Sequence, residues 1–129
     1  MFTPTSAYAS FSVDDIAAAK KFYGETLGLA VTESDMGTLR LALPGGTVAF
    51  IYPKDNHEPA SFTVLNFVAE DVAAAVDQLN AAGVRTKIYE NTGDEDDLHT
   101  DDKGIADGHD MQIAWFKDPA GNVLSVVSG

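Results

Sequence analysis

The fold is decided by residues 11–29, Phe-Ser-Val-Asp-Asp-Ile-Ala-Ala-Ala-Lys-Lys-Phe-Tyr-Gly-Glu-Thr-Leu-Gly-Leu. This stretch predicts the end of a strand, a capped helix and a sharp exit into a second strand. Asp14 and Asp15 precede Ile16, and a carboxylate there can accept the free amide hydrogens of a first helical turn. Gly28 closes the unit, because a residue just past a helix often has a positive φ. A mostly apolar helix face follows from the three- and four-residue spacing of Ile16, Ala19, Phe22, Tyr23 and Thr26.

The same pattern occurs a second time at residues 66–84, Asn-Phe-Val-Ala-Glu-Asp-Val-Ala-Ala-Ala-Val-Asp-Gln-Leu-Asn-Ala-Ala-Gly-Val. Asp71 falls at the position of Asp15. Gly83 follows the second helix as Gly28 follows the first, one residue earlier than strict spacing would put it. The sequence therefore predicts two copies of strand, helix and three strands, fused head to tail in one α+β domain that spans residues 1–129.

Period-two alternation and turn residues place the strands and the second helix. In the first unit, residues 5–54, we expect strands at 7–13, 31–33, 38–43 and 47–52. In the second unit, residues 61–129, we expect strands at 62–69, 84–89, 111–116 and 122–127, with a helix at 72–82. Alternation also predicts that Phe11 and Val13 pack under the first helix, while the smaller polar side of their strand faces whatever the sheet encloses.

Residues 90–110 break the symmetry, because they replace a four-residue turn at residues 34–37 of the first copy. A loop this long inside a compact domain usually has a function or is disordered. Its acidic side chains and two histidines, His99 and His109, match no calcium-loop spacing. We expect a solvated loop, or a lid over the second half of the molecule whose acidic groups attract a cation.

Composition limits the function before any motif does. At 129 residues, the chain is large enough to bury one core. The absence of cysteine excludes disulfides and thiolate metal sites. A net charge of −12 with only eight basic residues argues against nucleic acid and would favour a cationic ligand. No stretch approaches the length needed to span a bilayer, and we expect a cytoplasmic protein without membrane contact.

Three features together resemble the vicinal oxygen chelate superfamily, which contains glyoxalase I, extradiol dioxygenases, fosfomycin resistance enzymes and bleomycin resistance proteins. They are Phe22-Tyr23 followed by Leu27-Gly28-Leu29, the paired βαβββ units, and residues 115–122, Trp-Phe-Lys-Asp-Pro-Ala-Gly-Asn. The resemblance covers nearly the whole chain. It implies that each unit curls into a half-barrel and that two units make a cup for the ligand.

In metal-dependent members of that superfamily, four positions in the cup carry His or Glu. Carried over onto this sequence, the positions are occupied by Tyr8, Phe50, Val64 and Ser125. None of these side chains is a strong ligand for a divalent ion, which needs converging imidazole and carboxylate lone pairs. The resemblance therefore implies a member with no metal and no cofactor, and it disfavours glyoxalase, dioxygenase and fosfomycin-transferase chemistry.

The same positions suit a planar or drug-like molecule, because aromatic faces can stack on it and sparse polar groups can orient it. Bleomycin resistance proteins look similar, since they lack metal and sequester a cationic drug as dimers. We expect a binding protein without catalytic residues, and a homodimer that covers exposed sheet edges. The expected ligand-binding residues are Tyr8, Ser10, Phe50, Tyr52, Val64, Asn66, Phe116 and Ser125.

Two other functions stay open at this point. The chain could be a lyase, isomerase or epimerase that uses metal-free acid/base chemistry or a metal held by Glu90, His99 and His109. It could instead be an interaction module whose cup is filled by its own side chains. The second reading predicts no stabilisation by any small molecule.

The orientation of several side chains is also open. A four-residue turn at 118–121 pairs Phe116 with Val123, which places Phe116 in the cup and Trp115 against the helices, whereas a bulge would reverse the two. Arg40 is the odd charge in an apolar strand, either an exposed residue or a partner for an anionic group in the cup. His57, in the linker between the units, is expected to be a surface residue.

Overall fold

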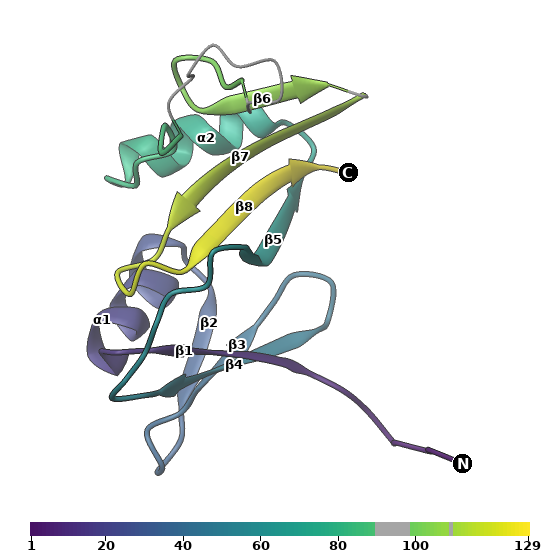
Figure 1. Ribbon diagram of the computed structural model, residues 1–129, viewed down its shortest axis with the longest axis vertical. Coiled ribbons are helices and arrows are strands. Elements are labelled where there is room, and N and C mark those ends of the chain that lie inside the picture. The colour runs from purple at the N-terminus through teal and green to yellow at the C-terminus, as the bar shows by residue number, and fades with distance from the viewer. Residues whose placement is uncertain (90–98, 109) are drawn as a thin grey trace. The chain divides into compact units, whose positions relative to one another are not determined.

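A computed structural model describes residues 1–89, 99–108 and 110–129. The described chain divides into two compact units, Met1–Pro59 and Ala60–Gly129 (Figure 1). Each unit contains a four-stranded sheet of mixed strand direction. Among the described residues, no helix has the length and apolar character needed to cross a bilayer.

The first unit has the predicted order of strand, helix and three strands. Its sheet has the order β1-β4-β3-β2, in which β1 runs parallel to β4 and the other neighbours are antiparallel. The elements are β1 (Ala9–Val13), α1 (Ile16–Lys21), the π-helical turn η1 (Phe22–Thr26), β2 (Ala30–Glu33), β3 (Leu39–Ala42) and β4 (Val48–Pro53).

The predicted capping of the first helix is confirmed at Asp15. Its backbone is extended, with φ −134° and ψ 104°, and its carboxylate accepts a hydrogen bond from the amide of Ala18 at 3.1 Å. The helix then widens into η1, where the amide of Leu27 donates to the carbonyl of Phe22 at 2.9 Å. Gly28 follows with φ +74°, a conformation that favours glycine, and it turns the chain into β2.

The core of the first unit lies between its sheet and its helix. Phe11, Val13 and their neighbours on the same face are buried, as the alternation of β1 predicts. Tyr23 is fully buried, and its ring lies 6.1 Å from that of Phe11, measured between centroids. The opposite face of this sheet, turned away from α1, is here called the open face of unit 1. Its side chains are Tyr8, Ser10, Ser12, Ala30, Thr32, Arg40, Ala42, Val48, Phe50 and Tyr52.

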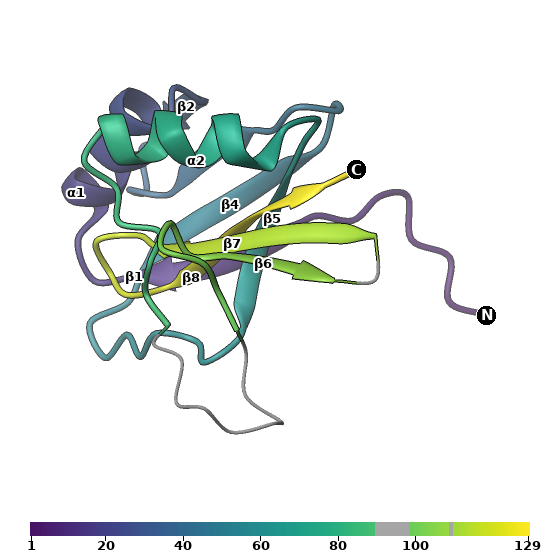
Figure 2. The same cartoon turned by 90° about the horizontal axis from the view of Figure 1, so that it is seen from above.

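The second unit repeats this plan with the sheet order β5-β8-β7-β6, in which β5 runs parallel to β8. Asp71 caps its helix as Asp15 caps α1, with φ −127° and ψ 98°. Figure 2 shows α2 running along one face of the strands, where a core forms from Val72, Val76, Ile105, Ala114 and Val126. The elements are β5 (Thr63–Ala69), α2 (Val72–Ala81), β6 (Ile105–Gly108), β7 (Met111–Lys117) and β8 (Val123–Ser128).

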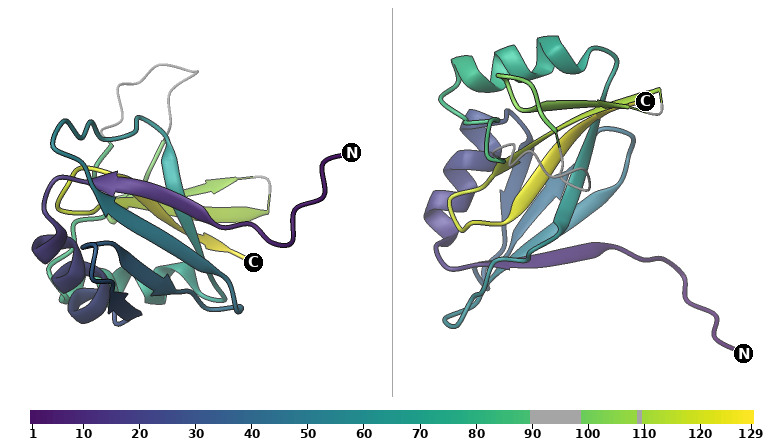
Figure 3. Two further views of the ribbon diagram at one scale, coloured as in Figure 1. Left: turned by 90° about the horizontal axis from the view of Figure 1, so that it is seen from below. Right: turned by 45° about the horizontal axis from the view of Figure 1, so that its top comes forward.

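The predicted strand at 84–89 was wrong. These residues join no sheet ladder, and β6, which lies within the predicted loop 90–110, pairs with β7 as β2 pairs with β3 (Figure 3). The hydroxyl of Thr86 donates instead to the carbonyl of Lys103 at 2.6 Å, and Lys87 donates to the carbonyl of Thr100 at 3.2 Å. The insertion therefore precedes the second strand of the unit rather than following it. Residues 90–98 and 109 lie outside the described residues.

The predicted pairing of the last hairpin was wrong by one residue. Phe116 pairs with Leu124, and Trp115 pairs with Ser125. The amide of Asp118 donates to the carbonyl of Asn122 at 3.0 Å, and Gly121 has φ +86°, so the loop has three residues and ends in a glycine bulge. The bulge gives the reversed orientation: Phe116 faces α2, and Trp115 faces the other side of the sheet.

Candidate ligand-binding site

The open face of unit 1 carries a pair of aromatic rings in contact, one exposed and one partly buried. Tyr8 is 65% exposed, and its ring packs on Phe50 with centroids 4.7 Å apart and planes inclined by 58°. Phe50 is partly buried, and Tyr52, two residues along β4 on the same face, is 40% exposed. A tilted pair that includes an exposed ring can receive a further flat ring by stacking.

Polar groups surround this pair in a regular order. Ser10 lies opposite Phe50 on one side, and Arg40 lies opposite Phe50 on the other. Arg40 and Phe50 are directly opposed on antiparallel strands, where such residues have Cβ atoms about 4.5–5.5 Å apart, so their side chains can reach the same small molecule. Arg40 is exposed, and among the described residues no carboxylate forms an ion pair with it.

A histidine adjoins the same face. The Oγ atom of Ser12 and the Nδ1 atom of His57 are hydrogen-bonded at 2.7 Å, and His57 is partly buried rather than a free surface residue. The amide of His57 donates to the carbonyl of Lys54 at 3.1 Å, which turns the linker back towards β1. The expectation of a surface residue was therefore wrong. No local sequence pattern predicts this contact, because the two residues are 45 positions apart.

The second unit has an equivalent face, turned away from α2. Asn66 lies opposite Ser125 in the same register as Ser10 opposite Phe50, which confirms the internal repeat at the level of single residues. Ser125 is fully buried, and its hydroxyl donates to the Oδ1 atom of Asn66. A serine held in this way contributes no exposed donor of its own, and the free polar group at this position is the amide of Asn66.

Trp115 is the residue that the predicted set lacked on this second face. Its indole N–H donates to the hydroxyl of Thr63 at 3.2 Å, and its ring meets that of Tyr89 edge-on with centroids 5.5 Å apart. Trp115 occupies the position in β7 that Arg40 occupies in β3, since Trp115 pairs with Ser125 and Arg40 with Phe50. Val64 lies at the irregularity in β5 between Thr63 and Leu65.

The predicted set is therefore only partly brought together. Phe116 lies on the helix side, 1% exposed, with its ring stacked on Phe67 at 6.5 Å, and its prediction for the open face was wrong. The two faces belong to different units. Tyr8, Ser10, Phe50 and Tyr52 share the open face of unit 1, while Asn66 and Ser125 share the corresponding face of unit 2.

The donor chemistry at the four positions expected to carry metal ligands does not fit a divalent ion. A phenol, a phenyl ring, an isopropyl group and a buried hydroxyl supply no imidazole or carboxylate. Within the described ranges, no group of three or more metal-ligating side chains forms. Of the residues proposed for a metal in the loop, His99 is exposed, and Glu90 and His109 lie outside the described residues.

A separate groove of about 660 Å³ lies at the edge strand β2, on the helix side of the first sheet. Lys20 and Glu33 form an ion pair across it at 3.0 Å. Its charges are of both signs and partly satisfy one another, so the groove indicates no single ligand chemistry. The lining residues are Ala17, Lys20, Lys21, Gly24, Glu25, Leu29, Val31 and Glu33.

Solved structures with the same fold include proteins of different function. TnmS3, an antibiotic-binding protein from Streptomyces sp. CB03234, is 26% identical with a TM-score of 0.64, and the match covers 98% of each chain. Lactoylglutathione lyase from Agrobacterium tumefaciens is 19% identical with a TM-score of 0.62, over 98% of this chain and 96% of the other. At that lower identity the likeness concerns the fold alone.

A search of curated proteins found no significant match to the sequence. The sequence model described as the glyoxalase/bleomycin resistance protein/dioxygenase superfamily matches residues 5–126. This match spans both repeats, the capped helices and the two hairpins. The chain belongs to the glyoxalase/bleomycin resistance protein/dioxygenase superfamily.

Proposed function

We propose that this chain binds a planar, drug-like small molecule without a metal ion and without converting it. The observation that carries the proposal is the packed pair of the exposed Tyr8 and the partly buried Phe50 on the open face of unit 1. These residues occupy two of the positions that hold metal ligands in metal-dependent relatives. Aromatic rings there can stack on a flat ligand, whereas they cannot complete the coordination of a divalent ion.

The surrounding side chains support reversible binding. Ser10, Tyr52 and the pair of Ser12 and His57 offer a few polar groups beside the aromatic surface, a mixture typical of sites for small organic molecules. The similarity to TnmS3, which is described as an antibiotic-binding protein, agrees with this ligand class. The net charge of −12 attracts cations at long range, and cationic drugs are therefore among the candidate ligands.

The proposal predicts that truncation of either aromatic ring weakens binding. Tyr8→Ala or Phe50→Ala should each raise the Kd of a planar aromatic ligand about tenfold, because one ring of the stacked pair is lost. A screen by thermal shift identifies the ligand, and calorimetric titration measures the Kd.

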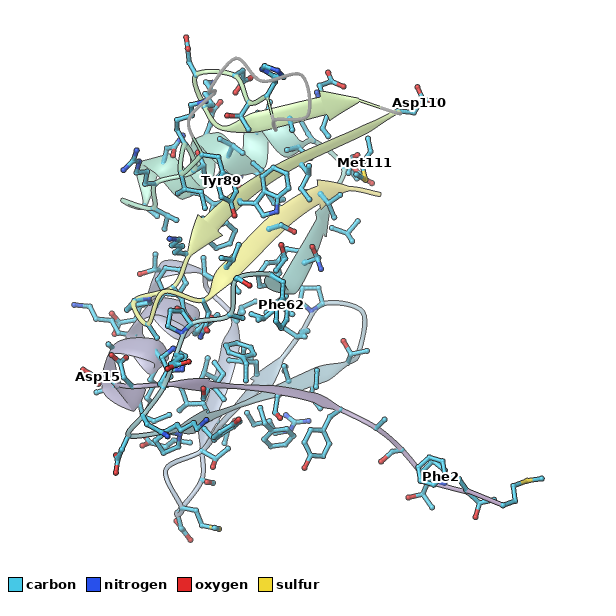
Figure 4. The ribbon with its side chains drawn as sticks, viewed as in Figure 1. Phe2, Asp15, Phe62, Tyr89, Asp110 and Met111 are labelled. Atoms are coloured by element: carbon cyan, nitrogen blue, oxygen red, sulfur yellow. The ribbon has the colours of Figure 1, made fainter. Side chains whose placement is uncertain are left out.

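Phe2→Ala is the matched control. Phe2 is 90% exposed and lies in the tail before β1, so its loss should leave the Kd unchanged (Figure 4). Equal Kd values for the Tyr8, Phe50 and Phe2 variants would contradict the proposed site. A screen in which no aromatic compound raises the melting temperature would contradict the proposed function itself.

We further propose that the chain works as a homodimer. β1 and β2 are the edge strands of one sheet, and β5 and β6 are those of the other. Unpaired edges of this kind are commonly covered by a second chain. Sedimentation equilibrium should give twice the single-chain mass of 13.7 kDa. A single-chain mass at a concentration of about 100 µM would contradict the dimer, because a stable interface is saturated well below that level.

A further inference from the structure

Among the described strand residues that form the open face of unit 1, one side chain is charged. Arg40 lies in β3, an inner strand of the sheet, between Thr32 on one side and Phe50 on the other. The other members of this face are alanine, valine, serine, threonine, tyrosine and phenylalanine. The nearest strand carboxylate, Glu33, points to the opposite side, where it pairs with Lys20 of α1 at 3.0 Å.

The position of Arg40 is unusual for a chain with this charge. The chain has 20 acidic and eight basic residues, yet among the described residues no carboxylate forms an ion pair with Arg40. Side-chain alternation brings Arg40 to the same face as the pair of Tyr8 and Phe50. One cation is thus placed beside an aromatic surface.

We propose that the ligand of this face is a planar aromatic molecule that carries a carboxylate or phenolate oxygen, which Arg40 binds. This inference rests on the proposed binding function and adds the chemical class of the ligand. A guanidinium presents its donors in a planar fork that matches a carboxylate in two parallel hydrogen bonds. A ring stacked on Phe50 presents its substituent to the neighbouring strand, because Arg40 is the direct cross-strand partner of Phe50.

The net charge of the chain does not oppose this assignment at contact distance. In physiological salt, interactions between exposed charges are largely screened beyond about 8 Å. The distributed acidic residues therefore influence the approach of a ligand, whereas Arg40 acts on the bound one. Net charge alone would favour a cationic ligand, whereas Arg40 favours an anionic group on the bound ligand.

Three naphthalene probes of one shape test the inference: 2-naphthoate, 2-naphthylmethanol and 2-naphthylmethylammonium. Their Kd values are measured by fluorescence titration against the full chain and its Arg40→Gln, Arg40→Lys and Lys21→Gln variants. Lys21→Gln removes the same charge from α1, on the other side of the sheet. Melting temperatures verify that each variant is folded.

The expected result is that 2-naphthoate binds about tenfold more tightly than the alcohol, and that the ammonium probe binds least tightly. Arg40→Gln should abolish the preference for the carboxylate while the alcohol keeps its Kd. Arg40→Lys should retain part of the preference, and Lys21→Gln should retain all of it.

Two results would overturn the inference, and they have different meanings. If the three probes bind with equal affinity, or if Arg40→Gln leaves the preference intact, Arg40 does not select the ligand, and the proposed aromatic site stands without it. If no probe binds the unmodified chain at millimolar concentration, the aromatic site itself fails, and the inference fails with it.

Discussion

The backbone at Gly104 lies against the backbone of Thr86. A Cβ atom placed on Gly104 would come within 2.0 Å of the carbonyl oxygen of Thr86, and Gly104 has φ +86°. The hydroxyl of Thr86 forms hydrogen bonds to the carbonyl of Lys103 and, at 3.1 Å, to the Oδ1 atom of Asn80. Only a residue without a side chain permits this approach, and the approach positions the start of β6.

Gly104→Ala should therefore destabilise the protein strongly. We expect the free energy of unfolding to fall by about 3 kcal/mol, because the clash with Thr86 adds to the strain of a left-handed alanine. Gly83→Ala is the matched control: Gly83 has φ +88°, with nothing within 4 Å of its Cβ position. Gly83→Ala should lower the free energy of unfolding by only about 1 kcal/mol. Urea denaturation measures the free energy of unfolding of both variants. Equal losses in the two variants would show that the backbone contact between Gly104 and Thr86 is not rigid.

Among elements, the two capped helices define the repeat. Asp15 and Asp71 both adopt an extended backbone, and each carboxylate accepts an amide hydrogen three residues ahead, at 3.1 Å and 3.0 Å. Each cap starts the helix at the same point after the first strand of its unit. Because each helix packs over one face of its sheet, the start of the helix also influences which strand residues are buried.

Asp15→Ala should lower the free energy of unfolding by about 1 kcal/mol, the usual effect of losing an N-cap side chain. Asp14→Ala removes the same charge one residue earlier. Asp14 is exposed and Asp15 supplies the cap, so the Asp14 variant should remain within about 0.5 kcal/mol of the parent. A larger loss in Asp14→Ala than in Asp15→Ala, measured by chemical denaturation, would contradict the assigned cap.

The sequence predicts such elements where the information is local. Three signals act within a few residues: the carboxylate caps, Gly28 and the alternation around Phe11. Because the pattern occurs in both units, the repeated fold could be predicted from it. The strand predicted at 84–89 failed for a non-local reason. Val84 and Thr86 alternate as buried residues, but Thr86 and Lys87 hydrogen-bond to the carbonyls of Lys103 and Thr100 and no residue of this segment joins a sheet. The face of Trp115 depended on the loop at Gly121, whose positive φ the residue type permits but does not require.

Part of the candidate site could be predicted in the same way. Tyr8, Ser10, Phe50 and Tyr52 share one face because strand alternation is local. The contact between Ser12 and His57 joins residues 45 positions apart across a linker, and no periodic pattern encodes it. Arg40 was recognised as unusual from sequence, whereas its place opposite Phe50 required the strand register.

For the whole molecule, the two units present related but different faces. Unit 1 offers the rings of Tyr8 and Phe50 and an arginine that forms no ion pair among the described residues. The corresponding positions of unit 2 hold a buried serine and a tryptophan that is hydrogen-bonded to Thr63. The duplication has thus diverged in side chains while keeping its strand register. We therefore assign the ligand to the open face of unit 1, and a ligand at a hundred times its Kd should stabilise the folded chain by about 2.7 kcal/mol.

The central claim is that Tyr8 and Phe50 bind an aromatic molecule without a metal ion. The most direct test is a calorimetric titration of 2-naphthylmethanol into the full chain, with either a chelator or a divalent metal ion present, and into the double variant Tyr8→Ala/Phe50→Ala. We expect the same Kd with chelator and with metal, and an affinity at least about tenfold lower in the double variant. Binding that requires the metal, or that survives in the double variant, would contradict it.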